Sequence, residues 1–183
     1  MRYKTMPSEL FSKNRSQFWK NMTDNSIAIF HSNDLMPKNA DQLMPFVQNS
    51  DLFYLSGIDQ EETVLVIIKT RQAIEEVLFI RETNDLIKVW EGNKLTKEQA
   101  KQISGIKKIY WESDFKKLLP KLIKNKKHVY LNSNEHPRAN VVVESRDARF
   151  KKWVEKNYPN HIYKKSANLL YGIRAVKQKE EID

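Results

Sequence analysis

The chain has 183 residues, 40% of them hydrophobic and 30% charged, which suits one globular domain with a proper core and excludes a disordered chain. It contains no cysteine, which excludes disulfides, thiolate metal sites and cysteine nucleophiles and fits a reducing compartment. The net charge of +9 would suit a surface that binds a polyanion. Because the lysines form only short clusters, we favour solvated helix faces, with nucleic-acid binding as the alternative.

The first half of the chain predicts one helix followed by strands. Apolar residues at three- and four-residue spacings indicate the helix, with Ser8 as its cap. Asp24 and Asn25 indicate a turn, and Ser32 to Pro45 is a loop of the length that is often functional. The polar cluster Gln48 to Asp51 separates neighbouring elements. The expected elements are a helix over Ser8–Met22 and strands over Ser26–His31, Leu52–Leu55, Thr63–Ile68 and Glu76–Arg81.

The second half alternates helices with short strands. Thr96 and Gln99 have the spacing of a capping box, and Gly105 is expected to end that helix. Asn84 to Glu91 is a short segment with Trp90 near its end. The expected helices are Leu95–Ser104, Ser113–Lys124, Val141–Tyr158 and Ala167–Val176, and the expected strands are Lys107–Trp111, His128–Asn132 and an edge strand Ile162–Lys164. This order predicts an α/β fold, a mixed central sheet of about six strands with helices on both faces.

Neither catalysis nor metal binding is expected from these residues. The four histidines show no ligand spacing on one helix face, and the pairs Glu61-Glu62 and Glu75-Glu76 would point to opposite faces if extended. No serine lies in a G-x-S-x-G elbow, and four glycines are too few for a phosphate loop. The longest apolar run, Val64 to Ile68, is too short to span a bilayer, and the amino terminus has no signal peptide. We therefore expect a cytoplasmic protein that does not associate with membranes.

The last seven residues, KQKEEID, look like the first turn of a further helix whose apolar face does not follow. Helices in proteins are stabilised mostly by packing of such a face. We therefore expect this chain to be a piece of a longer protein.

Three separated motifs carry a resemblance to a known family. They are NADQLMPFVQNSDLFYLSGIDQEETVLVIIK at Asn39 to Lys69, VWEGNKLT around Trp90, and IRAVKQKEEI near the end. In this order they resemble the amino-terminal domain of aminopeptidase P, the Xaa-Pro aminopeptidase of the creatinase and prolidase group. Val47 departs from the pattern, because family members often have Arg there, which puts in doubt an ion pair across the domain junction.

The resemblance implies a creatinase N-terminal fold with a ribonuclease H-like motif over residues 1–174, and a linker beginning at residues 175–183 that leads into a missing metallopeptidase domain. That domain would hold two divalent metal ions through two Asp, one His and two Glu, with manganese as the expected element, while this chain would hold none. The chain would be non-catalytic and would contact its own catalytic domain, the peptide substrate and further copies in a dimer or tetramer. A prolidase-like or creatinase-like parent is the other option, and a stand-alone nucleic-acid module is the rival from a different class.

The resemblance also implies roles for three residues. Trp90 would form an apolar wall of the substrate site in a neighbouring subunit, although a core position beside Val89 is the alternative. Asp41 would belong to a hydrogen-bond network at the domain and subunit junction, against a local Asx-turn. Tyr54 is assigned to the same junction, against a core position with its hydroxyl bonded internally.

Overall fold

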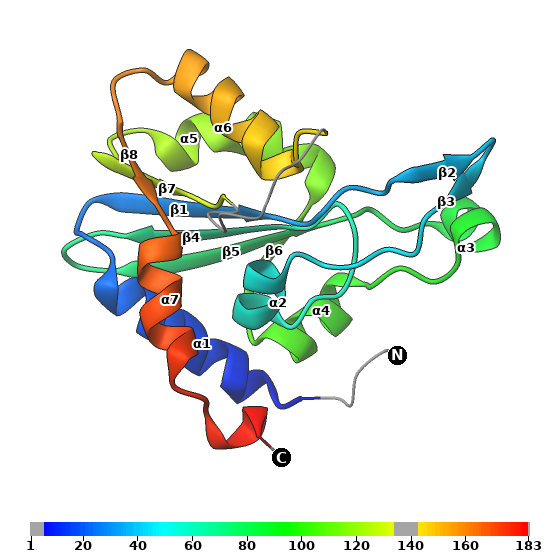
Figure 1. The fold of residues 1–183 in the computed structure, drawn as a ribbon, viewed down its shortest axis with the longest axis horizontal. Coiled ribbons are helices and arrows are strands. Elements are labelled where there is room, and N and C mark those ends of the chain that lie inside the picture. Colours follow the sequence, from blue (N-terminus) through cyan, green and yellow to red (C-terminus); the bar gives the residue numbers. More distant parts are fainter. Residues whose placement is uncertain (1–5, 134–142, 183) are drawn as a thin grey trace.

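The computed structural model describes residues 6–133 and 143–182. Its centre is a six-stranded sheet in the order β6-β5-β4-β1-β7-β8 (Figure 1). The pairs β1·β4 and β4·β5 are antiparallel, whereas β1·β7, β5·β6 and β7·β8 are parallel. The strands are β1 Ser26–His31, β4 Val64–Lys69, β5 Ile74–Ile80, β6 Lys108–Trp111, β7 His128–Leu131 and β8 Ile162–Lys165. The predicted mixed sheet is therefore confirmed, and β8 is an edge strand as expected.

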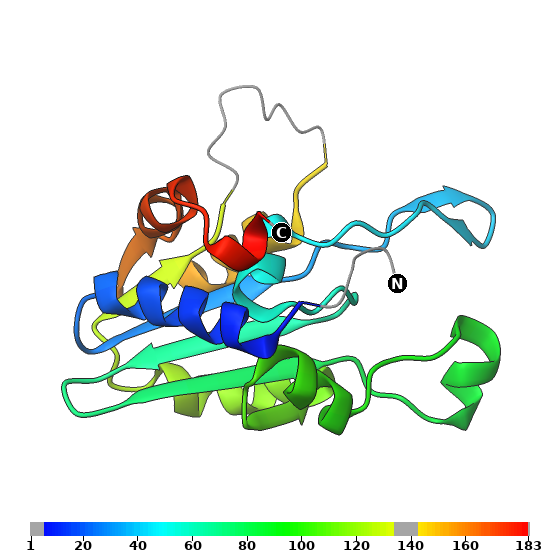
Figure 2. The ribbon, with the colours of Figure 1, turned by 90° about the horizontal axis from the view of Figure 1, so that it is seen from below.

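Helices cover both faces of this sheet (Figures 1 and 2). One face carries α1, α2, α4 and α7, and the other carries α5 and α6. The helices are α1 Ser8–Asn21, α2 Ser50–Ser56, α3 Asp85–Glu91, α4 Lys97–Ser104, α5 Phe115–Ile123, α6 Arg146–Asn157 and α7 Ala167–Ala175, with short 3-10 turns η1 Glu112–Asp114 and η2 Lys179–Glu181. No helix in the described residues combines the length and the apolar character needed to cross a bilayer.

Each face of the sheet has its own hydrophobic core. All six residues of β1 are buried, and because side chains alternate along a strand, Ala28 and Phe30 join the core under α1 and α2. Ile27 and Ile29 join the core under α5 and α6. The sequences of the central strands are therefore continuous apolar runs, which is typical of strands buried on both faces.

The predicted strand Leu52–Leu55 is wrong, because these residues lie in the middle of α2. The Asn49 side chain accepts hydrogen bonds from the backbone N–H groups of Asp51 and Leu52, which caps the first turn. Gly57 ends the helix in a left-handed conformation with φ 70°, where an added Cβ would meet the Phe11 ring. The polar cluster separates a loop from a helix, and the apolar run does not pair in the sheet.

Helix α6 begins at Arg146 with Ser145 as its cap, five residues later than the predicted start at Val141. Residues 143–145 are not helical, and 141–142 lie outside the described residues. The remaining predicted helices and strands are confirmed with small shifts in their ends. At α4 the capping box of Thr96 and Gln99 is present, and Gly105 follows it in a left-handed conformation.

Two segments project from the body at the same end of the molecule (Figures 1 and 2). One is a hairpin of β2 Pro37–Asn39 and β3 Gln42–Leu43, which occupies the predicted functional loop. The other contains α3 and spans residues 82–94; we call it the arm.

Candidate functional site

Trp90 lies on the arm, away from both hydrophobic cores (Figure 1). Its side chain is 79% exposed, that of Val89 is 76% exposed, and α3 has no buried residue. The alternative of a core tryptophan beside Val89 is therefore wrong. A large exposed aromatic ring on a projection is a feature of binding surfaces.

Local hydrogen bonds form α3 without help from the core. The Asn84 side chain accepts from the Ile87 N–H at 2.8 Å, which caps the first turn. Gly92 ends the helix, and its N–H donates to the Lys88 carbonyl at 3.2 Å. Its φ of 79° is a conformation that L side chains rarely adopt, although the space around it is open.

Four charged side chains at the base of the arm hold it to the body; we call Glu61, Arg81, Glu91 and Lys94 the arm clamp. Arg81 at the end of β5 lies 3.3 Å from Glu61 and 2.6 Å from Glu91. Lys94 forms an ion pair with the same oxygen of Glu61. Because α3 has no buried residue, we expect these ion pairs to determine the direction of the arm.

Glu61 and Glu62 are not extended, so the condition under which they would point to opposite faces is not met. Glu62 has a φ of 51°, so the segment is not extended and both carboxylates reach Arg81, at 3.3 Å and 3.7 Å. Sequence reasoning missed this arrangement because Lys94 and Glu61 are 33 positions apart. No local spacing relates the members of the clamp.

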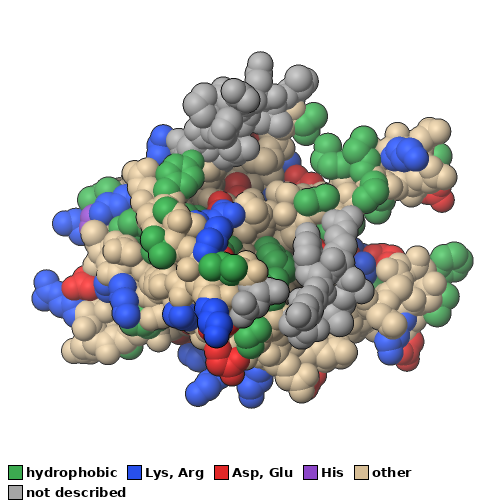
Figure 3. Space-filling view, turned by 60° about the horizontal axis from the view of Figure 1, so that its bottom comes forward, with side chains coloured by type: hydrophobic (Ala, Val, Ile, Leu, Met, Phe, Trp, Pro, Cys, Tyr) green, Lys and Arg blue, Asp and Glu red, His purple; other side chains and the backbone are tan. Residues whose placement is uncertain are grey.

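Asp41 lies in the turn of the hairpin between β2 and β3 and is exposed. In the described part of the chain its carboxylate forms no hydrogen bond or ion pair, so the local Asx-turn gains no support. Exposed hydrophobic side chains gather on the two projections (Figure 3). They are Met36, Leu43 and Met44 at the hairpin and Leu86, Val89 and Trp90 on the arm.

Tyr54 is buried on α2, with its hydroxyl donating to the Ile173 carbonyl of α7 at 3.3 Å. The Arg174 guanidinium lies 5.4 Å from the centre of its ring and forms an ion pair with Asp51. Burial raises the pKa of Tyr54, the carboxylate of Glu181 raises it further, and Arg174 opposes the rise. The internal hydrogen bond expected for a core tyrosine is thus present, at the place where the chain leaves α7.

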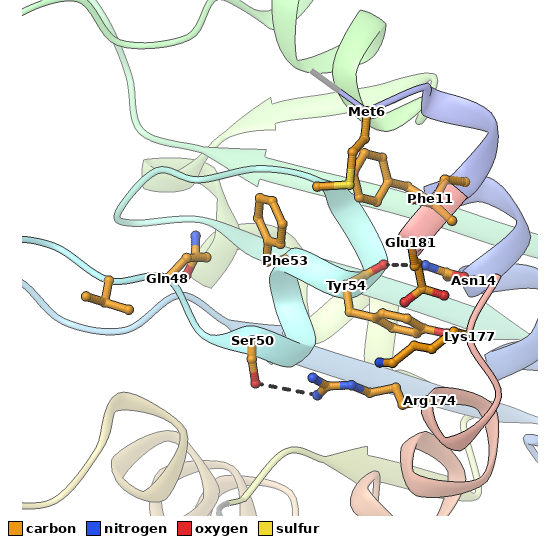
Figure 4. Close-up of a pocket in the computed structure, with 12 residues that line it drawn as sticks. Met6, Phe11, Asn14, Gln48, Ser50, Phe53, Tyr54, Arg174, Lys177 and Glu181 are labelled. Carbon is orange, nitrogen blue, oxygen red and sulfur yellow. Dashed lines mark hydrogen bonds between the residues drawn. The ribbon is translucent and has the colours of Figure 1, made fainter. Parts of the chain in front are cut away.

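A cavity of about 400 Å³ opens beside Tyr54 (Figure 4); we call it the α1–α7 cavity. Residues of α1 and α2 form one side, and Arg174, Lys177 and Glu181 form the other. The predicted junction residue Tyr54 and the tail motif IRAVKQKEEI therefore meet in space. Trp90 does not line this cavity.

The histidines have separate surroundings. His31 Nδ1 lies 3.2 Å from the buried carboxylate of Asp147, and His161 contacts the Lys126 carbonyl. Desolvation lowers the pKa of His128, and the charges of Lys164 and Lys127 lower it further, while His136 lies outside the described residues. No group of three His, Cys, Asp or Glu side chains in residues 6–133 and 143–182 could hold a metal ion.

Residues 11–130 match the family model of the aminopeptidase P N-terminal domain. The Xaa-Pro aminopeptidase of Haemophilus influenzae is 30% identical over 125 residues, which are 68% of this chain and 29% of that protein. The Xaa-Pro aminopeptidase of Escherichia coli is 26% identical over 148 residues, which are 80% of this chain and 34% of that protein. The chain therefore spans about a third of the length of these relatives.

Solved structures agree over nearly the whole chain. A Bacillus anthracis protein assigned to aminopeptidase P has a TM-score of 0.89 and 29% identity, over 97% of this chain and 42% of that one. Zinc-substituted aminopeptidase P of Escherichia coli, in complex with product, shares the fold with a TM-score of 0.78 and 24% identity, over 98% of this chain and 41% of that one. From the family model and these relatives, the chain belongs to the aminopeptidase P N-terminal domain family.

Proposed function

We propose that the chain is the non-catalytic N-terminal domain of a cytoplasmic Xaa-Pro aminopeptidase, with residues 1–174 as the domain and 175–183 as the start of a linker. The observation that carries this proposal is the match over 97% of the chain to a part, 42%, of an aminopeptidase P structure. Two divalent metal ions, with manganese as the expected element, would be held by the domain that follows, where they activate water for attack on the bond before proline. The residues of this chain then supply contacts and not the reacting groups.

Trp90 would close over the peptide substrate of a neighbouring subunit. Its 79% exposed ring on a charge-anchored arm can cover a reaction site in another molecule without disturbing its own core. An apolar wall excludes water and so strengthens the electrostatic interactions inside the site. This role requires a homo-oligomer, a dimer or a tetramer.

Tyr54 and Asp41 would act at the domain and subunit junction. Tyr54 contacts α7 where the chain leaves the body, so its own catalytic domain is the partner expected there. Asp41 at the tip of the hairpin has a carboxylate with no partner in the described residues, which leaves it free to accept hydrogen bonds across a junction.

The test uses the protein encoded by the full reading frame. Reading the codons after Asp183 should reveal the two Asp, one His and two Glu ligands implied by the resemblance. Hydrolysis of an Xaa-Pro peptide is then compared for wild type, Trp90→Ala and Trp90→Phe. We expect Trp90→Ala to lower kcat/KM by at least about tenfold, a loss of about 1.4 kcal/mol of transition-state stabilisation.

Trp90→Phe should retain most of the activity because it keeps a flat ring. Trp153→Ala is the matched control, since Trp153 is a partly exposed tryptophan on α6, and it should change kcat/KM less than about twofold. An unchanged kcat/KM in Trp90→Ala would refute the wall, and a reading frame without the five ligands would refute the parent enzyme.

A further inference from the structure

The α1–α7 cavity has the size and lining of a site for a small molecule (Figure 4). Its volume of about 400 Å³ lies within the usual range for ligand pockets, about 300 to 1,000 Å³. Such pockets combine apolar walls with a few placed polar groups. The apolar residues here are Met6, Leu10, Phe11, Val47 and Phe53.

Asn14 has a buried acceptor without a donor. Its side chain is 1% exposed and lines the cavity. The Asn14 Nδ2 group donates to the Tyr54 carbonyl at 3.0 Å, while the Oδ1 atom has no hydrogen-bond partner in the described residues. This oxygen is itself buried and is not open to the cavity, so the role of Asn14 at this wall is its hydrogen bond to the Tyr54 carbonyl.

Two opposite charges around Tyr54 limit the ligand further. Glu181 accepts from the Gln178 N–H at 2.9 Å through Oε2 only, which leaves Oε1 for another donor. Lys177 has no ion-pair partner in the part of the chain that the structure describes. Arg174 also lines the cavity, but its guanidinium is already paired with Asp51. One carboxylate and one ammonium group are therefore available.

We propose that this cavity binds a small zwitterion with an apolar side chain, of the class of free L-leucine or L-methionine. The ligand ammonium donates to Glu181, because it carries N–H donors and a positive charge. The ligand carboxylate pairs with Lys177, and the apolar side chain packs against Phe11 and Phe53. This inference does not rest on the proposed role of Trp90, since Trp90 does not line the cavity.

Isothermal titration of the 183-residue chain with three probes tests the proposal. L-leucine carries both charges, isoamylamine lacks the carboxylate, and isocaproate lacks the ammonium group. We expect saturable binding of L-leucine with a Kd on the order of 1 mM, a normal affinity for so small a molecule. Each probe with a single charge should bind at least about tenfold more weakly, because one ion pair is lost.

Two variants assign the charges. Glu181→Gln keeps the acceptor for the Gln178 N–H and should weaken L-leucine and isoamylamine by about tenfold while leaving isocaproate unchanged. Lys177→Met should weaken L-leucine and isocaproate and leave isoamylamine unchanged. Glu180→Gln and Lys179→Met are matched controls, because these neighbours are exposed and do not line the cavity.

All four variants alter exposed or partly exposed side chains, and their circular dichroism should match that of wild type. The proposal is overturned if L-leucine shows no saturable heat, or if the control variants weaken it as much as Glu181→Gln and Lys177→Met do. It is also overturned if isocaproate binds as tightly as L-leucine, because the ammonium contact would then contribute nothing.

Discussion

At the scale of single residues, the least expected feature is a charged side chain inside the core. Arg15 lies on the face of α1 that the apolar spacing predicted to be hydrophobic, and it is 1% exposed. Its Nε lies 2.9 Å from Glu76 Oε2, and Nη1 donates to the Leu55 carbonyl at 2.9 Å. Desolvation lowers the pKa of Arg15, and Glu76 opposes that shift. The sequence could not reveal this, because Glu76 and Leu55 approach Arg15 only in the fold.

Replacing Arg15 by Met should destabilise the protein by about 2 to 4 kcal/mol, because the partner carboxylate and carbonyl lose their donor while the apolar stem is kept. Urea unfolding measures the change in free energy. Lys13→Met, at an exposed position of the same helix, is the control and should change stability by less than about 0.5 kcal/mol. Equal stability of the two variants would show that the buried ion pair contributes nothing.

Tyr163 should ionise at a higher pH than an ordinary tyrosine. Desolvation, the charge of Glu155 and the neighbouring Tyr158 together raise its pKa to about 12, and its hydroxyl donates to the Tyr158 carbonyl at 2.8 Å. A raised folded pKa means that the neutral phenol stabilises the fold below the ordinary tyrosine pKa of about 10, and that this stability is lost as pH rises through about 12. Ultraviolet titration of phenolate in wild type and Tyr163→Phe should differ by one late transition. A difference centred near the ordinary pKa would contradict this.

At the scale of elements, sequence patterns succeeded where a signal was local. The strand Ser26–His31 and the capping box at Thr96 are both present as predicted. Leu52–Leu55 failed because a short apolar run fits a buried strand and a buried helix equally well, and the cap at Asn49 decides between them. The charged contacts at the base of the arm could not be predicted, since they join the end of β5 to the α2–β4 connection and to Lys94, which are far apart in sequence.

Glu61→Gln should loosen the arm without unfolding the body. The substitution removes the charge that Arg81 and Lys94 share, and α3 has no buried residue to keep it in place. We expect backbone amides of residues 85–92 to exchange hydrogen at least about tenfold faster, a local opening easier by about 1.4 kcal/mol. Added salt should speed exchange in wild type in the same direction.

Glu75→Gln is the matched control for the arm clamp. It breaks an ion pair between Glu75 and Lys108 of 2.7 Å that lies on the sheet and not at the base of the arm. Exchange in residues 85–92 should stay as in wild type. If Glu61→Gln and Glu75→Gln gave the same exchange rates there, the clamp would not determine the position of the arm.

At the scale of the whole molecule, two cores share a single sheet. The central strands place alternate side chains in each core. If either layer of helices detached, it would expose one face of the same strands that the other layer packs against. The sequence indicated the alternation of helices and strands, but it could not assign each helix to a face. That assignment depends on the strand order, in which β1 lies between β4 and β7, far from its neighbours in sequence.

We therefore expect one cooperative unfolding transition. A mutation in either core should lower the free energy of unfolding of the whole domain. Leu52→Ala removes contacts under α2 and Leu119→Ala removes contacts under α5, and both side chains are fully buried. Each should lower the free energy of unfolding by about 2 to 5 kcal/mol. Leu86→Ala on the arm, where the side chain is 69% exposed, should cost less than about 0.5 kcal/mol. Calorimetry measures this. Every variant should show one peak whose calorimetric and van't Hoff enthalpies agree. A second peak in either core variant would mean that the two layers of helices unfold separately.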